Sequence, residues 1–153
     1  MSDGAVALHL VPMGVYYGTG KDGQRAVNTF LMGCYDPEHE QVLSVCKVGV
    51  GIPEDTIKVL LENQEITPVP PTTFQTTSTL TPDAWVVGGS SVWVVAAAEV
   101  ALSPGAAAAR NLVEDGKGVT ARFPRFIAVS DGRIAETATT VAMLMELYLA
   151  SKK

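Results

Sequence analysis

Short runs of β-forming residues, each closed by a turn signal, constrain the fold of this chain more than any other feature. Such runs, bounded by clusters of Gly, Pro, Asp and Ser, are typical of an all-β domain. The runs expected to form strands are 6–17, 29–35, 42–50, 93–102 and 119–129. About five or six strands with little helix predict a small Greek-key barrel, and the OB-fold is the commonest barrel of this kind.

The connections between these runs carry turn and loop chemistry. The hydrophilic segment 18–25 (GTGKDGQR) is expected to be a loop, and 36–40 (DPEHE) is expected to be a tight turn. Residues 66–84 contain four prolines and seven threonines with little periodicity. That composition predicts a long connection that is extended or partly disordered.

Two helices are expected beside the strands. One begins at Pro53, with two acidic residues in its first turn and apolar residues following at helical spacing. The other covers about 140–150, where helix formers dominate and Thr139 or Thr140 can cap the first turn. The barrel is therefore expected to carry a C-terminal helix.

The composition suits one folded domain. A chain of 153 residues is long enough for one substantial core, and a hydrophobic share of 47% excludes global disorder. Residues 1–153 are therefore expected to form a single domain. The formal charge of −5 argues against a protein that binds nucleic acid over its whole surface, but it is compatible with a local basic patch.

Neither a secretory signal nor a membrane span is expected. The N-terminus lacks a basic region followed by an apolar one. The most apolar stretch, 86–102, is interrupted by glycines, serines and a glutamate. Cys34 and Cys46 each lie within an apolar run, which favours buried free thiols over a disulfide, and two cysteines without partner histidines cannot form a zinc site.

Six sequence blocks occur in a recognisable order and spacing. They are VPMGVYYGTGK (11–21), FLMGCYDPEHE (30–40), VCKVGVGIPED (45–55), PDAWV (82–86), VWVVAAAEVALSP (92–104) and KGVTARFPRFIAV (117–129). The set resembles the C-terminal OB-fold domain of eukaryotic-type ATP-dependent DNA ligases, nearest to the replicative branch, and the match covers about residues 8–140. Its most specific parts are RFPRF (122–126), LSP (102–104) and ATT (138–140).

The resemblance implies that the chain is part of a larger enzyme. In that family a lysine of a Lys-x-Asp-Gly motif, in a nucleotidyltransferase domain that precedes the OB-fold domain, takes AMP from ATP. The AMP then passes to a 5′-phosphate before the nick is closed. No such motif occurs in this chain. We therefore expect a fragment or separate domain that has no nucleophile of its own and is inactive alone.

The cofactors and partners implied by the resemblance follow from that reaction. ATP and Mg²⁺ are implied for the full-length enzyme, with neither bound tightly by this domain alone. Nicked duplex DNA and the nucleotidyltransferase domain of the same parent protein are the implied partners, and no membrane partner is expected. The implied processes are DNA replication, repair and recombination, in the nucleus or the mitochondrion.

Arginines placed between aromatic residues mark the candidate site. A guanidinium presents a planar fork of donors that matches phosphate geometry and stays charged. Phe123 or Phe126 can wedge into a widened minor groove or pack in the core. By resemblance, Arg122 and Arg133 are expected to orient phosphates and so assist catalysis in the partner domain. The expected DNA contacts are Lys21, Arg25, Lys47, Phe123 and Arg125.

Departures from the family pattern keep two alternatives open. Val94 and Ala96 replace a glutamate and a lysine, and Gly132 stands where an aspartate is usual before Arg133. These losses suit a ligase-derived module that serves as a structural or protein-interaction domain. A module for single-stranded DNA would need exposed stacking aromatics, and the candidates for that role are Trp85, Trp93 and Tyr35.

Overall fold

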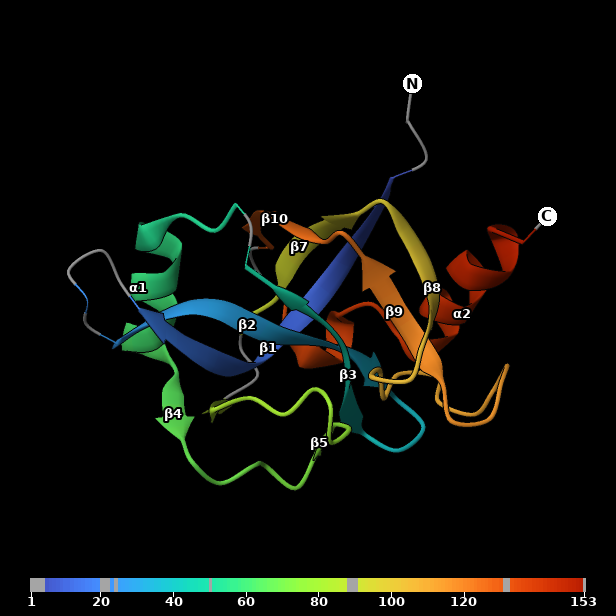
Figure 1. The fold of residues 1–153 in the computed structure, drawn as a ribbon, viewed down its shortest axis with the longest axis horizontal. Coiled ribbons are helices and arrows are strands. Elements are labelled where there is room, and N and C mark those ends of the chain that lie inside the picture. The colour runs from blue at the N-terminus through green and yellow to red at the C-terminus, as the bar shows by residue number, and fades with distance from the viewer. Residues whose placement is uncertain are drawn as a thin grey trace.

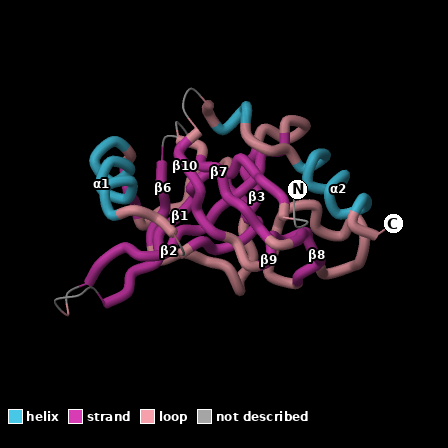
Figure 2. The backbone as a smooth tube through the Cα atoms, turned by 90° about the horizontal axis from the view of Figure 1, so that it is seen from above, coloured by secondary structure: helices cyan, strands magenta, loops and turns pink. Residues whose placement is uncertain are grey.

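The computed structural model describes residues 5–19, 23, 25–49, 51–87, 91–130 and 133–152. These residues form a mostly β molecule with α1 (Glu54–Asn63) at one end and α2 (Val141–Ala150) at the other (Figures 1 and 2). The main sheet curls into a half-barrel. The expected fold class, a small barrel of the OB type with a C-terminal helix, is confirmed.

Three long strands form an antiparallel meander that is the largest part of the sheet. They are β1 (Val6–Thr19), β2 (Arg25–Asp36) and β3 (Gln41–Val48). Their pairing shifts register at bulges, for example between Met32 and Gly33, and a bulge bends its strand. Residues 10–15 of β1 are all buried, because the curled sheet provides a core on both faces of this strand.

The next strands complete the barrel wall in two pieces. They are β7 (Trp93–Ala97), β8 (Glu99–Ser103), β9 (Gly118–Arg122) and β10 (Arg125–Val129). β7 lies between β1 and β10 in the main sheet, whereas β8 and β9 form a separate two-stranded sheet. All the runs that were expected to be strands therefore take part in sheets.

Two of those runs are broken where the sequence predicted continuous strands. The run through β7 and β8 is divided at Ala98, and the run through β9 and β10 is divided at Phe123 and Pro124. The two breaks lie side by side, since the amide of Ala98 donates to the carbonyl oxygen of Arg122 at 3.0 Å. Phe123 has a left-handed φ of 54°. Pro124 has no N–H and cannot donate a hydrogen bond to a neighbouring strand. We call this paired break the crease.

The barrel closes between β3 and β9 through a side chain and a loop. The hydroxyl of Thr120 donates to the carbonyl oxygen of Val45 at 2.7 Å. The loop after β8 crosses the same gap, since the amides of Ala107 and Ala108 both donate to the carbonyl oxygen of Ser44 at 3.0 Å. The uncharged alanine run is therefore part of the core, which explains its composition.

Three short strands lie in or beside the proline- and threonine-rich connection. They are β4 (Glu65–Thr67), β5 (Phe74–Gln75) and β6 (Ala84–Val87). β6 pairs with both β1 and β4, and β5 runs parallel to β3. The connection is extended, as expected, but it also adds to the sheet, which its composition did not indicate.

Both predicted helices are present, and the second has the expected threonine cap. Pro53 precedes α1, and the hydroxyl of Thr140 caps α2 by accepting a hydrogen bond from the amide of Met143 at 3.2 Å. A 3₁₀ turn, Ala135–Thr137, lies shortly before α2. Within the described ranges, neither helix is long and apolar enough to cross a membrane.

An aromatic cluster fills the core beneath the crease. Trp93 is 1% exposed, and its ring centroid lies 4.9 Å from that of Phe30 and 5.1 Å from that of Phe126, in edge-to-face contacts. Cys34 and Cys46 are buried free thiols, as expected, and burial raises the pKa of each to about 12. These thiols are therefore packing residues.

Candidate functional site

The crease exposes two arginines and an aromatic ring between β9 and β10. Arg122 ends β9 and Arg125 begins β10. Phe123 is 72% exposed, and its ring centroid lies 5.6 Å from the guanidinium carbon of Arg122. A bulky residue held in the left-handed region is strained, and such strain concentrates at functional sites.

Arg122 is held only loosely by the protein itself. Its Nε lies 3.7 Å from a carboxylate oxygen of Glu99, which is its cross-strand partner in the β8–β9 pair. Both side chains are more than half exposed, and an exposed pair at this distance contributes little to stability. The guanidinium of Arg122 therefore remains available to an anion that binds it more tightly than Glu99 does, such as a phosphate.

Arg125 lies on the other side of the crease with its side chain exposed. Its partner across the ladder is Ala96, so no second charge faces it there. No carboxylate within the described ranges pairs with its guanidinium. Arg125 is thus an exposed cation without a carboxylate partner among the described residues, and its predicted contact to DNA stays a prediction.

The two phenylalanines of the RFPRF run have different environments. Phe126 is 8% exposed and packs edge to face on Trp93, so it is a core residue. Phe123 is exposed, so of these two rings it is the one that could enter the groove of a DNA ligand. The sequence left both possibilities open for both residues, because a β-run with a proline in it does not show which side chain turns inward.

Lys47 is a second exposed cation, near the end of β3. Its ammonium lies 4.7 Å from the ring centroid of Tyr16, and a cation over an aromatic face is attracted by the ring. The hydroxyl of Tyr16 is buried without a hydrogen-bond partner among the described residues. Burial, followed by the charge of Asp83, raises the pKa of Tyr16 to about 12, so the ring stays neutral beneath the lysine.

The end of β3 and the start of β10 are neighbours. A side-chain carbon at Gly51 would lie 3.1 Å from the carbonyl oxygen of Phe126, and Gly51 has a φ of 85°. Only glycine combines this backbone conformation with so close an approach. The chain that leaves β3 after Lys47 therefore runs beside the strand that carries Arg125.

Arg133 is exposed and its position is fixed by a backbone oxygen. Its Nη1 donates to the carbonyl oxygen of Thr137 at 2.6 Å. Burial, followed by the positive charge of Arg133, lowers the pKa of His9. The Nδ1 of His9 lies 3.3 Å from the hydroxyl oxygen of Ser130, so His9 is a structural residue, as a lone histidine in an apolar strand suggests.

Part of the predicted site cannot be placed. Lys21 and Gly132 lie outside the described residues, as does the side chain of Arg25, whose backbone begins β2 opposite Thr19. The predicted stacking aromatics are placed, and all are at most 9% exposed: Tyr35, Trp85 and Trp93. This burial leaves no platform for bases at these three positions, which argues against the single-stranded DNA module.

The described residues present exposed cations and no cluster of metal-ligating side chains. No group of three or more His, Cys, Asp or Glu side chains in the described ranges could hold a metal ion. The exposed guanidinium groups, in contrast, are donors that suit phosphate oxygens.

Sequence reasoning missed the residues that support these cations. Glu99 faces Arg122 across a strand pair, Tyr16 lies under Lys47, and Thr137 anchors Arg133. Glu99 and Tyr16 are brought to their partners only by strand register, so no local pattern reveals them. Thr137 lies four residues from Arg133, but its carbonyl oxygen carries no signal in the sequence.

The strained backbone of Phe123 leads to a test of its role. Replacing Phe123 by glycine should raise the free energy of unfolding by up to about 1 kcal/mol, because glycine relieves a left-handed conformation that costs about 1–2 kcal/mol and only part of that gain is offset by chain entropy. Urea unfolding measures the change. Phe123→Ala is the control, since it removes the ring but keeps the strain, and it should be less stable than Phe123→Gly. A loss of more than about 1 kcal/mol in the glycine variant would mean that the ring is a packing residue.

Residues 23–132 match the model of the ATP dependent DNA ligase C terminal region. DNA ligase 1 of Schizosaccharomyces pombe is 36% identical over 146 residues, which are 93% of this chain and 19% of that protein. The DNA ligase of Aeropyrum pernix is 35% identical over 91% of this chain and 23% of its own length. The ligase domain of LigD from M. tuberculosis shares the fold, with a TM-score of 0.61 and 18% identity over 89% of this chain and 39% of that domain. The chain thus spans about a fifth of the length of the curated relatives it matches.

Proposed function

The chain belongs to the family of ATP-dependent DNA ligase C-terminal regions, and on that premise we propose that it is the OB-fold domain of such a ligase. In this role it contacts nicked duplex DNA. It also brings arginines to the nucleotidyltransferase domain of the same protein during adenylylation and nick sealing. The chain covers a small part of its relatives, so the activity belongs to the whole enzyme.

The observation that carries the proposal is the exposed run at the crease. Arg122 and Arg125 flank a strained, 72% exposed Phe123, although the chain as a whole is acidic with a formal charge of −5. A purely structural module would gain nothing from this arrangement. Guanidinium groups suit phosphates, and an exposed ring between them suits a widened minor groove.

The contact to DNA should be weak for this domain alone. Arg122, Arg125, Lys47 and Arg133 are the described cations of the candidate site, and each neutralised phosphate contributes about −0.9 to the salt slope of duplex binding. With about four such contacts, we expect affinity in the non-specific range of roughly 10⁻⁴ to 10⁻⁶ M. Tight binding would require the neighbouring domain.

In adenylylation the chain would supply orientation and charge. The partner domain supplies the lysine nucleophile, and ATP supplies the AMP that is transferred. Arg122 would donate to phosphate oxygens from its loosely held position beside Glu99, and Arg133 would do so from its anchored position beside Thr137. Neither arginine needs to change protonation state, because a guanidinium stays charged at working pH.

The test is to restore lysine adenylylation by mixing this chain with a separately produced nucleotidyltransferase domain. Labelled AMP on the lysine of that domain is the readout. Wild-type chain should stimulate the reaction, and Arg122→Ala should lower the stimulation about tenfold or more, since a hydrogen bond to a charged group contributes about 1.5–3 kcal/mol.

Lys117→Ala is the matched control. It also removes one exposed positive charge, next to the opposite end of β9, where Lys117 pairs with Glu114 at 2.9 Å. This variant should stimulate like the wild type. Equal stimulation by the Arg122 and Lys117 variants, or none by the wild type, would contradict the catalytic part of the proposal and favour a structural or protein-interaction module.

A further inference from the structure

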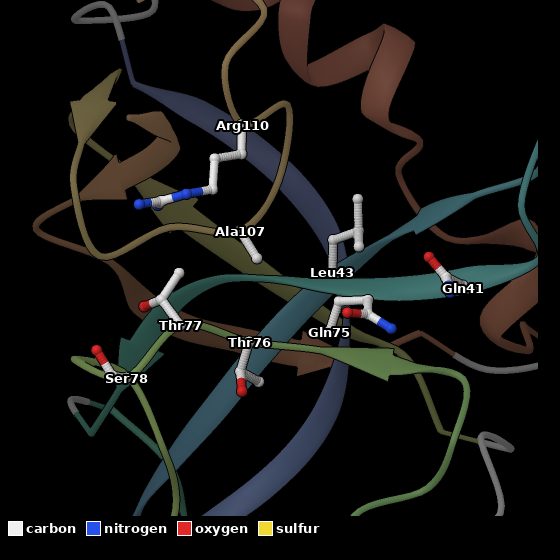
Figure 3. Close-up of a pocket in the computed structure, with 8 residues that line it drawn as sticks. All are labelled: Gln41, Leu43, Gln75, Thr76, Thr77, Ser78, Ala107 and Arg110. Carbon is white, nitrogen blue, oxygen red and sulfur yellow. The ribbon is translucent and has the colours of Figure 1, made fainter. Parts of the chain in front are cut away.

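A polar pocket lies away from the crease, between β3, β5 and the loop after β8. Its volume is about 570 Å³, and it is lined by Gln41, Leu43, Gln75, Thr76, Thr77, Ser78, Ala107 and Arg110. Figure 3 shows these side chains, with Arg110 on one side and the segment through Thr77 and Ser78 on the other. None of the lining residues is acidic, which is notable in a chain of net charge −5.

Arg110 is held in place by the loop that carries it. Its Nη1 donates to the carbonyl oxygens of Pro104 at 2.9 Å and Ala106 at 3.0 Å. The side chain is half-buried, and no carboxylate in the described ranges forms an ion pair with it. Three of the five guanidinium hydrogens, on Nε and Nη2, therefore remain without a partner among the described residues.

The opposite wall of the pocket is tied to the same loop. The hydroxyl of Thr77 donates to the carbonyl oxygen of Gly105 at 2.6 Å, so the two walls are fixed relative to each other. Ser78 is exposed, and its hydroxyl has no partner within the described residues. Ala107 is anchored to Ser44 by its amide. The pocket is thus pre-formed, and ordering it costs a ligand little entropy.

We propose that this pocket binds a phosphate group, with the free face of the Arg110 guanidinium as its main contact and the hydroxyl of Ser78 as a second donor. Nη1 of Arg110 is satisfied by two carbonyl oxygens, but its Nε and Nη2 still present three hydrogens and no carboxylate among the described residues offsets its positive charge. Its planar fork and the hydroxyl on the facing wall are donors that suit the oxygens of a phosphate. The bound group is either a backbone phosphate of duplex DNA or a free phosphate ion. The first case would extend the DNA contact beyond the crease, and it rests on the proposed function.

The first arm of the test uses inorganic phosphate and this chain alone. Phosphate at constant ionic strength should shift the amide NMR signals of residues 77, 78 and 110 in a saturable way. Ser78→Asp places a carboxylate on the pocket wall that faces Arg110 and should weaken phosphate binding about tenfold or more, because it repels the anion.

The matched control is Thr72→Asp, which adds the same charge at an exposed position of the same connection outside the pocket. It should leave phosphate binding unchanged. Both substitutions are at surface positions, so neither is expected to prevent folding. Arg110→Gln should also abolish binding, but the Ser78 variant decides the outcome if loss of the loop contacts unfolds the Arg110 variant.

The second arm identifies the source of the phosphate. Ser78→Asp should reduce the salt slope of binding to nicked duplex by about 0.9 if the pocket holds a backbone phosphate. An unchanged slope, together with lost binding of inorganic phosphate, would assign the pocket to a free phosphate. The absence of saturable shifts, or identical shifts with chloride, overturns the inference, whatever the result at Arg122.

Discussion

Replacing Trp93 by alanine should lower the free energy of unfolding by about 3–5 kcal/mol, the usual cost of truncating a buried tryptophan. Trp93 is 1% exposed and contacts the rings of both Phe30 and Phe126 edge to face. It joins β7 to the meander on one side and to β10 on the other. The cavity would therefore lie where β7, the meander and β10 meet.

Urea unfolding followed by circular dichroism measures this loss. Ile127→Ala is the control, because Ile127 is also apolar and lies in the adjacent strand β10 but is 49% exposed. It should cost less than about 1 kcal/mol, as surface substitutions generally do. A Trp93 variant that is no less stable than the Ile127 variant would show that this cluster is not the core of the barrel.

Replacing Gly118 by alanine should cost about 3 kcal/mol, at the upper end of the range for overpacking. The added carbon would overlap the carbonyl oxygen of Ala106 and would lie 2.6 Å from that of Ala108. Both atoms are backbone, and the oxygen of Ala108 already accepts a hydrogen bond from the amide of Val119 at 2.8 Å. The loop cannot withdraw without breaking the contacts that close the barrel.

Gly116→Ala is the control for the glycine substitution. Nothing lies within 4 Å of a side-chain carbon at Gly116, but its φ is 78°, so the expected cost is the backbone strain of about 1–2 kcal/mol. Differential scanning calorimetry of the two variants gives the comparison. A melting temperature for the Gly118 variant at or above that of the Gly116 variant would contradict the close packing described here.

The sequence predicts the order of strands and the caps because those signals are local. Turn residues separate the β-runs, and Pro53 and Thr140 stand where their helices begin. The crease was not predicted, because apolar residues continue without interruption through Ala98 and because Phe123 gives no sign of a left-handed backbone. Strand β5 was missed for another reason, since it is only two residues long and lies among prolines and threonines that show no period of two.

The candidate site was predicted in part. Arg122, Arg125 and Lys47 are exposed, which is compatible with the predicted phosphate and DNA contacts, but their roles in binding remain predictions. The choice between Phe123 and Phe126 needed the structure, because it depends on which side of the bend faces Trp93. The Arg110 pocket could not be predicted, since strand β5, which brings Ser78 near the loop, was not expected.

The crease has a consequence for the spacing of Arg122 and Arg125. One belongs to the two-stranded β8–β9 sheet and the other to the main sheet, and their strands are separated by a left-handed residue and a proline. Any rotation of one sheet against the other therefore changes the gap between the two positive charges. A bound ligand that contacts both guanidinium groups would therefore fix the angle between the β8–β9 sheet and the main sheet.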